Sequence, residues 1–232
     1  MRPSEFTNIS NLFKKVANKY DFMNDVMSFG IHRLWKSHFV DNLNIVNTSR
    51  VLDLACGTGD ISIKLLKKYK LQQLFVADLQ PAMLEKCTEN LVNAGYLNFS
   101  SFALDAVQLP FADSSFDCVT ISFGFRNFTN LTKSLQEIYR VLSPNGRLEI
   151  LEFSKPAASI QPFYDLFLQQ IPKIAQLAVK DEQSYKYLVD SIKAHPNQNQ
   201  LQNIILESGF EKVYYTNHSL GIAATHTAIK SC

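Results

Sequence analysis

The chain has 232 residues, of which 46% are hydrophobic and 19% charged, so it can bury a full core and its length fits one α/β domain. Lys and Arg number 23 against 21 Asp and Glu, and this balance, a net charge of +2 without a basic run, gives no electrostatic reason to expect a nucleic-acid partner. The N-terminal segment MRPSEFTNISNLFKK is not a signal peptide, and no run of about 18 uncharged apolar residues predicts a membrane span.

The four cysteines are scattered and form no C-x-x-C pair. They are Cys56, Cys87, Cys118 and Cys232. This pattern is typical of reduced, mostly buried thiols in a cytoplasmic protein, and it predicts no zinc or other metal site.

Residues 1–49 precede the first predicted strand, and we expect them to form a helical cap. Phe13, Val16, Tyr20 and Met23 recur at spacings of three and four, which is the spacing of one helix face. Polar residues gather around Tyr20, and from composition alone they indicate the solvated side of a packed helix.

The stretch RVLDLACGTGD, residues 50–60, organises the rest of the chain. A short apolar run surrounds Asp53, Gly57 and Gly59 bracket Thr58, and an amphipathic helical pattern follows from Asp60. The order predicts a strand, a ligand-binding turn and a helix. Glycines let the backbone approach a ligand closely, but the third glycine of the dinucleotide fingerprint is missing, so a pyrophosphate site is disfavoured.

This turn is similar to motif I of the class I S-adenosylmethionine-dependent methyltransferases, in which it holds the methionine end of the cofactor. The matching candidates are Asp53, Gly57, Thr58 and Gly59. The next apolar run, LFVAD, ends in Asp78, roughly twenty residues after the turn, where a carboxylate can accept the ribose hydroxyls. NAD enzymes share that spacing, so Asp78 does not decide between the two cofactors.

The third predicted strand, FSSFALDA, ends in Asp105 and Ala106 and follows a helix that starts at Pro81 and stops at Gly95. Open parallel sheets collect ligand groups at this edge. A carboxylate here can accept the adenine amino group, and the Ala106 amide can donate to a ring nitrogen. An ordinary loop cap is the alternative for Asp105.

The fourth strand covers residues 116–122 and ends in Ser122. A helix, an S-P-N-G turn and a fifth strand follow, so strands and helices alternate as in a parallel, doubly wound α/β sheet.

The segment 156–195 interrupts this alternation. Its apolar run, residues 160–179, contains Pro162 and Pro172 and is a poor surface helix. We expect this segment to bury against the sheet, to line an apolar pocket or to meet a membrane surface, and the residues alone do not discriminate among these three placements. A helix stopped by Gly209 and two strands joined near Gly221 then complete seven strands.

Five stretches carry a close resemblance to one family, the ubiquinone/menaquinone biosynthesis C-methyltransferases, which methylate a ring carbon of a polyprenylated quinol. They are VANKYDFMNDVMSFGIHRLWK, VLDLACGTGD, LPFADSSFDCVTISFGFRN, YRVLSPNGRLEILEFSKP and SYKYLVDSIKAHPNQ, and the resemblance as a whole covers roughly residues 13–221. The resemblance implies a class I methyltransferase fold with a seven-stranded, mostly parallel sheet, helices on both faces and an N-terminal helical lid.

We therefore expect one domain, residues 1–232, in four parts. These are a helical lid (1–49), a cofactor-binding core (50–154), an apolar helical insertion (155–197) and a terminal helix with a hairpin (198–232).

For the cofactor, the resemblance places Thr58 at the turn, Asp78 at the ribose, Asp105 with Ala106 at the adenine, and Ser122 near the methionine part. Only Ser122 goes beyond what the residues predict by themselves.

For catalysis, the resemblance makes the block around Tyr20 a lid over the quinol and puts Arg126 and Asn127 beside the transferable methyl. We expect Arg126 to stabilise the phenolate that develops on the reduced ring, while Asn127 or Tyr20 holds the hydroxyl or a water. The reaction needs no metal.

The polyprenyl tail would explain the apolar segment 160–179, and it predicts peripheral contact with the inner face of the membrane that stores the quinol. The sequence leaves open whether the chain forms a homo-oligomer or joins a quinone-synthesis complex.

Cys56 favours demethylmenaquinol as the substrate, because a cysteine at this position of the turn resembles the menaquinone-only members of the family, although a cysteine there can also be a packing choice. The end THTAIKSC lacks the basic, aromatic tail of relatives.

Three alternatives remain. The enzyme methylates the ubiquinol precursor, alone or in addition; it acts on oxygen or nitrogen of a soluble small molecule; or it is a catalytically silent protein that assembles a quinone-synthesis complex. Cofactor binding and the ring that receives the methyl group discriminate among them.

Overall fold

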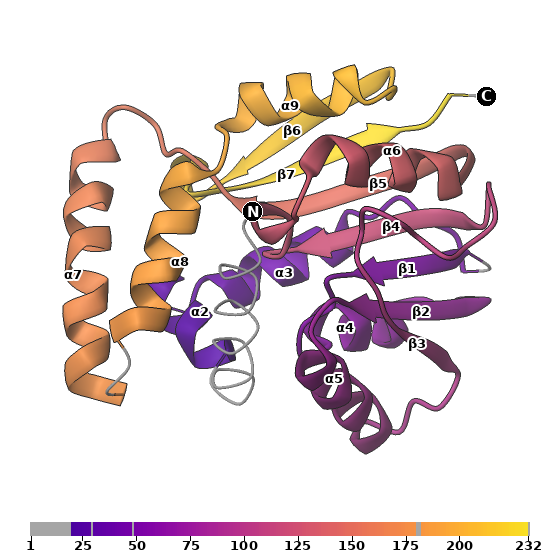
Figure 1. The fold of residues 1–232 in the computed structure, drawn as a ribbon, viewed down its shortest axis with the longest axis horizontal. Helices are drawn as coiled ribbons and strands as arrows, with labels where there is room; N and C mark the ends of the chain where they lie inside the picture. The colour runs from indigo at the N-terminus through magenta and orange to yellow at the C-terminus, as the bar shows by residue number, and fades with distance from the viewer. Residues whose placement is uncertain (1–19, 29, 48, 180–181, 232) are drawn as a thin grey trace.

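The computed structural model describes residues 20–28, 30–47, 49–179 and 182–231. The described residues form one seven-stranded sheet of order β3-β2-β1-β4-β5-β7-β6 (Figure 1). Its strands are β1 Arg50–Leu54, β2 Gln73–Asp78, β3 Phe99–Ala103, β4 Phe116–Ser122, β5 Leu142–Phe153, β6 Lys212–His218 and β7 Ala223–Ile229. Strands β1 to β5 pair in parallel, and β7 is antiparallel to both β5 and β6. The seven-stranded, mostly parallel sheet is confirmed.

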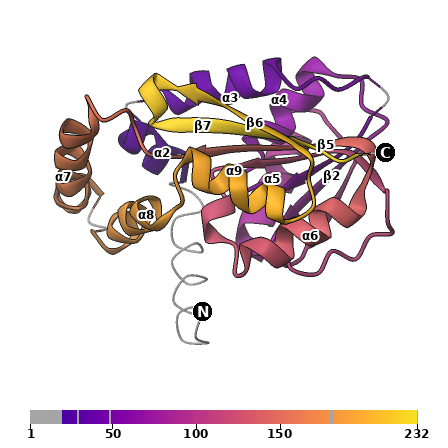
Figure 2. The ribbon, with the colours of Figure 1, turned by 90° about the horizontal axis from the view of Figure 1, so that it is seen from above.

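Helices cover both faces of this sheet, because its central strands are apolar on both sides. The helices are α2 Tyr20–Ser28, α3 His32–Asp41, α4 Asp60–Lys68, α5 Pro81–Asn93, α6 Leu131–Val141, α7 Gln161–Val179, α8 Glu182–Ala194 and α9 Gln198–Glu207. Val51 lies in a core with α3, α4 and α5, whereas its neighbour Leu52 lies in a second core with α6 and α9. Figure 2 shows α3 and α4 on one side of the sheet and α6 and α9 on the other.

Local sequence signals set several helix ends, and those at Pro81, Gly95 and Gly209 are as predicted. Pro81 occupies the first turn of α5, and Gly95 beyond its end has a left-handed backbone with φ 85°. Asn130 caps α6 by accepting from the Lys133 amide at 3.0 Å. Gly209, with φ 107°, follows the end of α9.

Two strand boundaries differ from the prediction. Strand β3 ends at Ala103, so Asp105 and Ala106 lie in the following loop, where the Val107 amide donates to Asp105 Oδ1 at 3.1 Å and turns the chain. Strand β5 already begins at Leu142 and includes the S-P-N-G residues, because the backbone around Asn145 stays hydrogen-bonded to Lys230 beyond β7.

The segment predicted to interrupt the alternation forms α7 and α8, and α7 continues through Pro172. Figure 1 shows α2, α7 and α8 together beyond the ends of the parallel strands. Helix α7 packs against α8 and α2, and its buried Leu168 and Ile171 belong to the same hydrophobic core as Val51 and Phe153 of the sheet. Of the three expected placements, the lining of an apolar pocket is seen directly, because one side of α7 lines an apolar cavity described below.

Candidate cofactor and substrate sites

The backbone is strained where β1 and β4 end side by side. Ala55 and Phe123, which follow these strands, both have left-handed backbones, with φ 56° and φ 55°. Such conformations cost a non-glycine residue about 1–3 kcal/mol and cluster at ligand sites. At Gly124 a Cβ atom would lie 2.6 Å from the Ala55 Cβ, so only glycine permits this approach of the two chain segments. The strain points to a binding site between the two strand ends.

A narrow cavity lies at this point, and it brings together several of the predicted residues. Asp53, Gly57, Thr58 and Ser122 all line it. The Ser122 hydroxyl is buried without a hydrogen-bond partner among the described residues, which leaves a polar atom for a ligand to satisfy. Gly59 has a different task, because a Cβ there would meet Cys87 Sγ at 2.8 Å, so it lets α5 pack on the turn.

Asp53 is held by the protein itself. Its carboxylate accepts from the Ser62 hydroxyl at 2.5 Å and from the Thr120 hydroxyl at 2.9 Å. Burial raises the pKa of Asp53 to about 6, against the opposing effect of the two hydroxyls. The negative charge therefore lies at the base of the cavity in a costly, low-dielectric position.

Asp78 ties β2 to the turn. Its carboxylate accepts from the Gly57 amide at 2.9 Å and from the Gln80 amide at 2.8 Å, while burial raises its pKa. A carboxylate offers about four acceptor positions, so Asp78 keeps acceptor capacity for a ribose hydroxyl beside these backbone amides. Asp78, Asp105 and Ala106 lie outside the lining of the narrow cavity, at or beyond the ends of the next two strands.

Asp105 also makes the loop-cap contacts given as its alternative. Beyond the Val107 amide, its carboxylate accepts from the Thr129 hydroxyl at 3.4 Å, and Ala106 beside it is buried. These contacts orient the carboxylate, and they are compatible with either role.

Sequence reasoning missed Lys36, which reaches the narrow cavity from α3. Its side chain is 6% exposed, and Nζ lies 3.0 Å from Asp60 Oδ2 at the start of α4. The available signal was its place on the buried face of α3 beside Trp35 and Phe39, where an unpaired lysine would be costly.

The predicted catalytic pair lies in a short 3-10 helix, η2 Phe125–Asn127, directly after β4. Arg126 Nη1 lies 2.8 Å from Glu152 Oε1, and these side chains are 2% and 1% exposed. Asn127 Oδ1 accepts from the Tyr187 hydroxyl at 2.9 Å. Arg126 thus has a buried counter-ion at the end of β5, and sequence analysis did not single out Glu152.

Tyr20, the third predicted catalytic residue, is the first residue of α2, but its side chain lies outside the described residues. Phe13 and Val16 of the predicted helical face also lie outside them. Asn24 on α2 is described, and its amide is buried with no hydrogen-bond partner from the other described residues.

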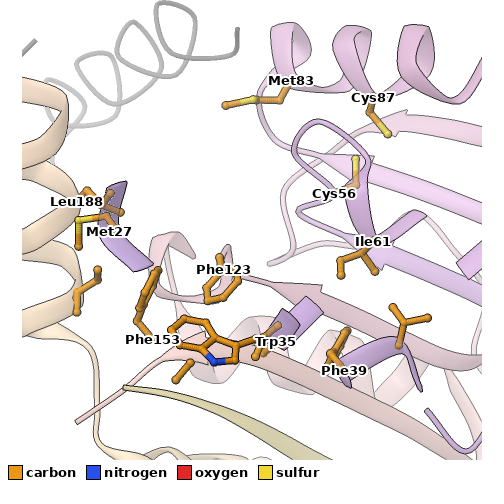
Figure 3. Close-up of a cluster of buried hydrophobic side chains, with 14 of the residues drawn as sticks. Met27, Trp35, Phe39, Cys56, Ile61, Met83, Cys87, Phe123, Phe153 and Leu188 are labelled. Carbon is orange, nitrogen blue, oxygen red and sulfur yellow. The ribbon is translucent and has the colours of Figure 1, made fainter. Parts of the chain in front are cut away.

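An apolar cavity of about 370 Å³ lies between α2, α3 and α7. The residues around it include Met27, Ile31, Trp35, Ile160, Phe163 and Tyr164. Trp35 packs against Phe123 of the narrow cavity with 6.4 Å between ring centroids (Figure 3), and its indole donates to the Ser219 hydroxyl at 3.0 Å. The two cavities therefore meet at one pair of aromatic rings.

Tyr164 lines the apolar cavity and lies near Arg126 of the predicted catalytic pair. Its hydroxyl is buried without a hydrogen-bond partner in the described part of the chain, and burial raises its pKa above the ordinary value while the nearby Arg126 guanidinium acts in the opposite direction. A polar ligand group at this end of the cavity would find the Tyr164 hydroxyl, with the Arg126 guanidinium near enough to act on it electrostatically.

Within the described part of the chain, no three His, Cys, Asp or Glu side chains are grouped so that they could hold a metal ion. Among the described helices, none has the length and apolar character needed to cross a membrane.

The sequence model of the ubiE/COQ5 methyltransferase family matches residues 1–230. The chain belongs to this family. Two relatives are named ubiquinone/menaquinone biosynthesis C-methyltransferase UbiE. The one from Blochmanniella floridana is 49% identical over 226 residues, covering 96% of this chain and 89% of the relative. The one from Proteus mirabilis is 44% identical over 228 residues, covering 97% and 91%.

Solved structures agree on the fold. A SAM-dependent methyltransferase from Aquifex aeolicus superposes with a TM-score of 0.64 at 18% identity, covering 93% of this chain and 97% of that one. The Haemonchus contortus phosphoethanolamine N-methyltransferase 2, in complex with S-adenosylhomocysteine, gives 0.64 at 16% identity, covering 86% and 53%. Membership of the ubiE/COQ5 family confirms an S-adenosylmethionine-dependent methyltransferase, and the narrow cavity with its unpartnered Ser122 hydroxyl fits that cofactor.

Proposed function

We propose that the enzyme methylates a ring carbon of a polyprenylated quinol. The observation that carries this proposal is the apolar cavity of about 370 Å³ that meets the narrow cavity at Trp35 and Phe123. The almost wholly apolar lining of this cavity suits an isoprenoid tail. The names of the relatives support the same substrate class.

The cofactor would lie along the ends of β1 to β4. We assign its methionine end to Asp53, Gly57, Thr58 and Ser122, with Gly59 shaping the turn. The ribose would lie at Asp78, and the adenine at Asp105 and the Ala106 amide. Support comes from the shared lining of the narrow cavity and from the remaining acceptor capacity of Asp78.

When bound, the cofactor supplies an electrophilic methyl group, and the chain's own residues orient and activate the ring. The substrate must be the reduced quinol, since a ring carbon becomes nucleophilic as the neighbouring phenol loses its proton. Arg126 would stabilise that phenolate, and Glu152 would fix its guanidinium. Asn127, held by Tyr187, and Tyr20 would position the hydroxyl or a water.

The role of Arg126 can be tested by replacing it with Ala. We expect turnover to fall by about 100-fold or more, as for loss of one oxyanion-stabilising donor. Unchanged turnover would rule out this role.

The tail would leave the protein along α7, where Phe163 and Leu166 are 74% and 58% exposed. We therefore propose peripheral contact with the inner face of the membrane, from the cytoplasmic side. The test is flotation with liposomes that contain the quinol. Phe163→Ser should release the protein, and Leu97→Ser, at a 78% exposed position before β3, should not. A wild-type protein that ignores such liposomes would contradict the proposal.

The preferred ring is demethylmenaquinol, with the Cys56 turn as its support, and the ubiquinol precursor is the alternative. Transfer of labelled methyl from S-adenosylmethionine to each reduced ring decides between them. Label on only one ring would identify the pathway in which the enzyme acts. Label on both rings would mean that the pocket recognises only the edge of the quinol and not the whole ring. No label on either ring, with the cofactor still bound, would favour the soluble-substrate reading, and failure to bind the cofactor would favour a silent assembly protein.

A further inference from the structure

A buried lysine in the narrow cavity has no task in the reaction described so far. Lys36 lies on α3, in the N-terminal part of the chain, yet its side chain lines the cavity beside Ser122 and Gly57. Its side chain is 6% exposed, and burying an ammonium group in this way is costly unless its donors find acceptors.

Asp60 satisfies this ammonium group only in part. An ammonium has three donors, and within the described residues Asp60, at 3.0 Å, is its one ion-pair partner. Asp60 itself also lies 4.0 Å from Lys64 Nζ and occupies the first turn of α4, where the helix dipole favours a negative charge. Asp60 therefore anchors Lys36 through one contact, and Lys36 still has donors for another acceptor.

The charges of the cavity match an amino-acid group. Its lining holds one cation, Lys36, together with the carboxylates of Asp53 and Asp60 and the unpartnered Ser122 hydroxyl. A free amino acid end carries an ammonium and a carboxylate on one carbon. The carboxylates of Asp53 and Asp60 can attract the ammonium group of such a ligand, and the Lys36 ammonium can pair with its carboxylate.

We propose that Lys36 binds the α-carboxylate of the methionine end of S-adenosylmethionine, and that Asp60 holds the lysine in place for this contact. The inference rests on the proposed placement of the cofactor. It makes α3 a part of the cofactor site, so the segment before β1 binds the cofactor as well as covering the substrate.

The test compares two ligands that differ in this one group, S-adenosylmethionine and decarboxylated S-adenosylmethionine. Binding to the full chain is measured by calorimetry without quinol, so no turnover enters the readout. A charge-assisted contact in a buried site predicts that the wild type prefers the intact cofactor by about 10- to 100-fold. Equal affinity for the two ligands in the wild type would overturn the inference without any variant.

The Lys36→Met variant should lose this preference. Its affinity for S-adenosylmethionine should fall by about 10- to 100-fold, while its affinity for the decarboxylated ligand stays as in the wild type. The matched control is Lys64→Met, which removes a second lysine near Asp60 that does not line the cavity, and it should change neither affinity. If Lys36→Met weakens both ligands equally, or neither, Lys36 is a structural residue and the inference is wrong.

Asp78→Asn separates this inference from the placement of the cofactor. Asp78 lies at the assigned ribose end, so the variant should weaken both ligands by the same factor and keep the preference. If both affinities are unchanged, the placement fails, and the inference fails with it.

Discussion

Replacement of Asp53 by Asn tests the electrostatics at the base of the narrow cavity. Folding raises the pKa of this carboxyl from 3.8 to about 6, because burial outweighs the hydrogen bonds from Ser62 and Thr120. The folded protein therefore holds this proton more tightly than the unfolded chain, and the ionisation of Asp53 removes stability as pH rises through the window from 3.8 to about 6.

The magnitude follows from the two pKa values. Each pKa unit corresponds to about 1.36 kcal/mol, so the ionised carboxylate lowers the free energy of unfolding by about 3 kcal/mol at pH 8 and by about 1.6 kcal/mol at pH 5. Asparagine has nearly the same shape without the charge. Its oxygen can accept from Thr120, and its amide can donate to Ser62 once that hydroxyl rotates.

We expect Asp53→Asn to be more stable than the wild type at pH 8 and to lose part of this advantage at pH 5. Urea unfolding of the cofactor-free protein at several pH values measures the difference. The same variant should bind S-adenosylmethionine more weakly, which is the usual cost of stabilising a functional site. A variant that is less stable at pH 8, or a difference that does not change with pH, would refute the argument.

Three further variants test the packing around the sites. Gly124→Ala places a methyl group against Ala55 and should destabilise the protein by about 1–3 kcal/mol in urea unfolding; unchanged stability would mean that the two strand ends can separate. Glu152→Gln leaves Arg126 without its buried counter-ion and should cost about 3–5 kcal/mol in the same assay, whereas a small loss would show that water reaches the guanidinium. Leu168→Ala should cost about 2–5 kcal/mol in thermal or urea unfolding with unchanged cofactor affinity, because it lies between α7 and α8; a loss of cofactor binding would contradict this separation.

The sequence predicted the parts of the fold that depend on local signals. Strand β4 has the predicted bounds, and the glycine turn after β1 leads into a helix that begins at Asp60. The apolar runs, Pro81 and the glycines after helix ends each act within a few residues, so their consequences can be inferred without the tertiary structure.

The contacts of the site depend on segments far apart in the chain, and here local reasoning failed. Lys36 pairs with Asp60 from a different helix, and Arg126 pairs with Glu152 from the next strand. Neither partner is marked by spacing or composition. The sequence also did not determine which side of α7 lines the apolar cavity. Most faces of this helix are apolar, and only its packing against α8 and α2 decides which of them faces the cavity.

The order of strands limits when the site can form during synthesis. Strand β7 follows β6 in the chain but lies between β5 and β6, so β6 has no place in the sheet until the ribosome has released β7 as well. The bond from Trp35 to Ser219 joins residues 184 positions apart and belongs to the wall of the apolar cavity. A nascent chain can therefore build the glycine turn early, yet its apolar cavity closes only after the hairpin has emerged, and until then the apolar lining is exposed to chaperones.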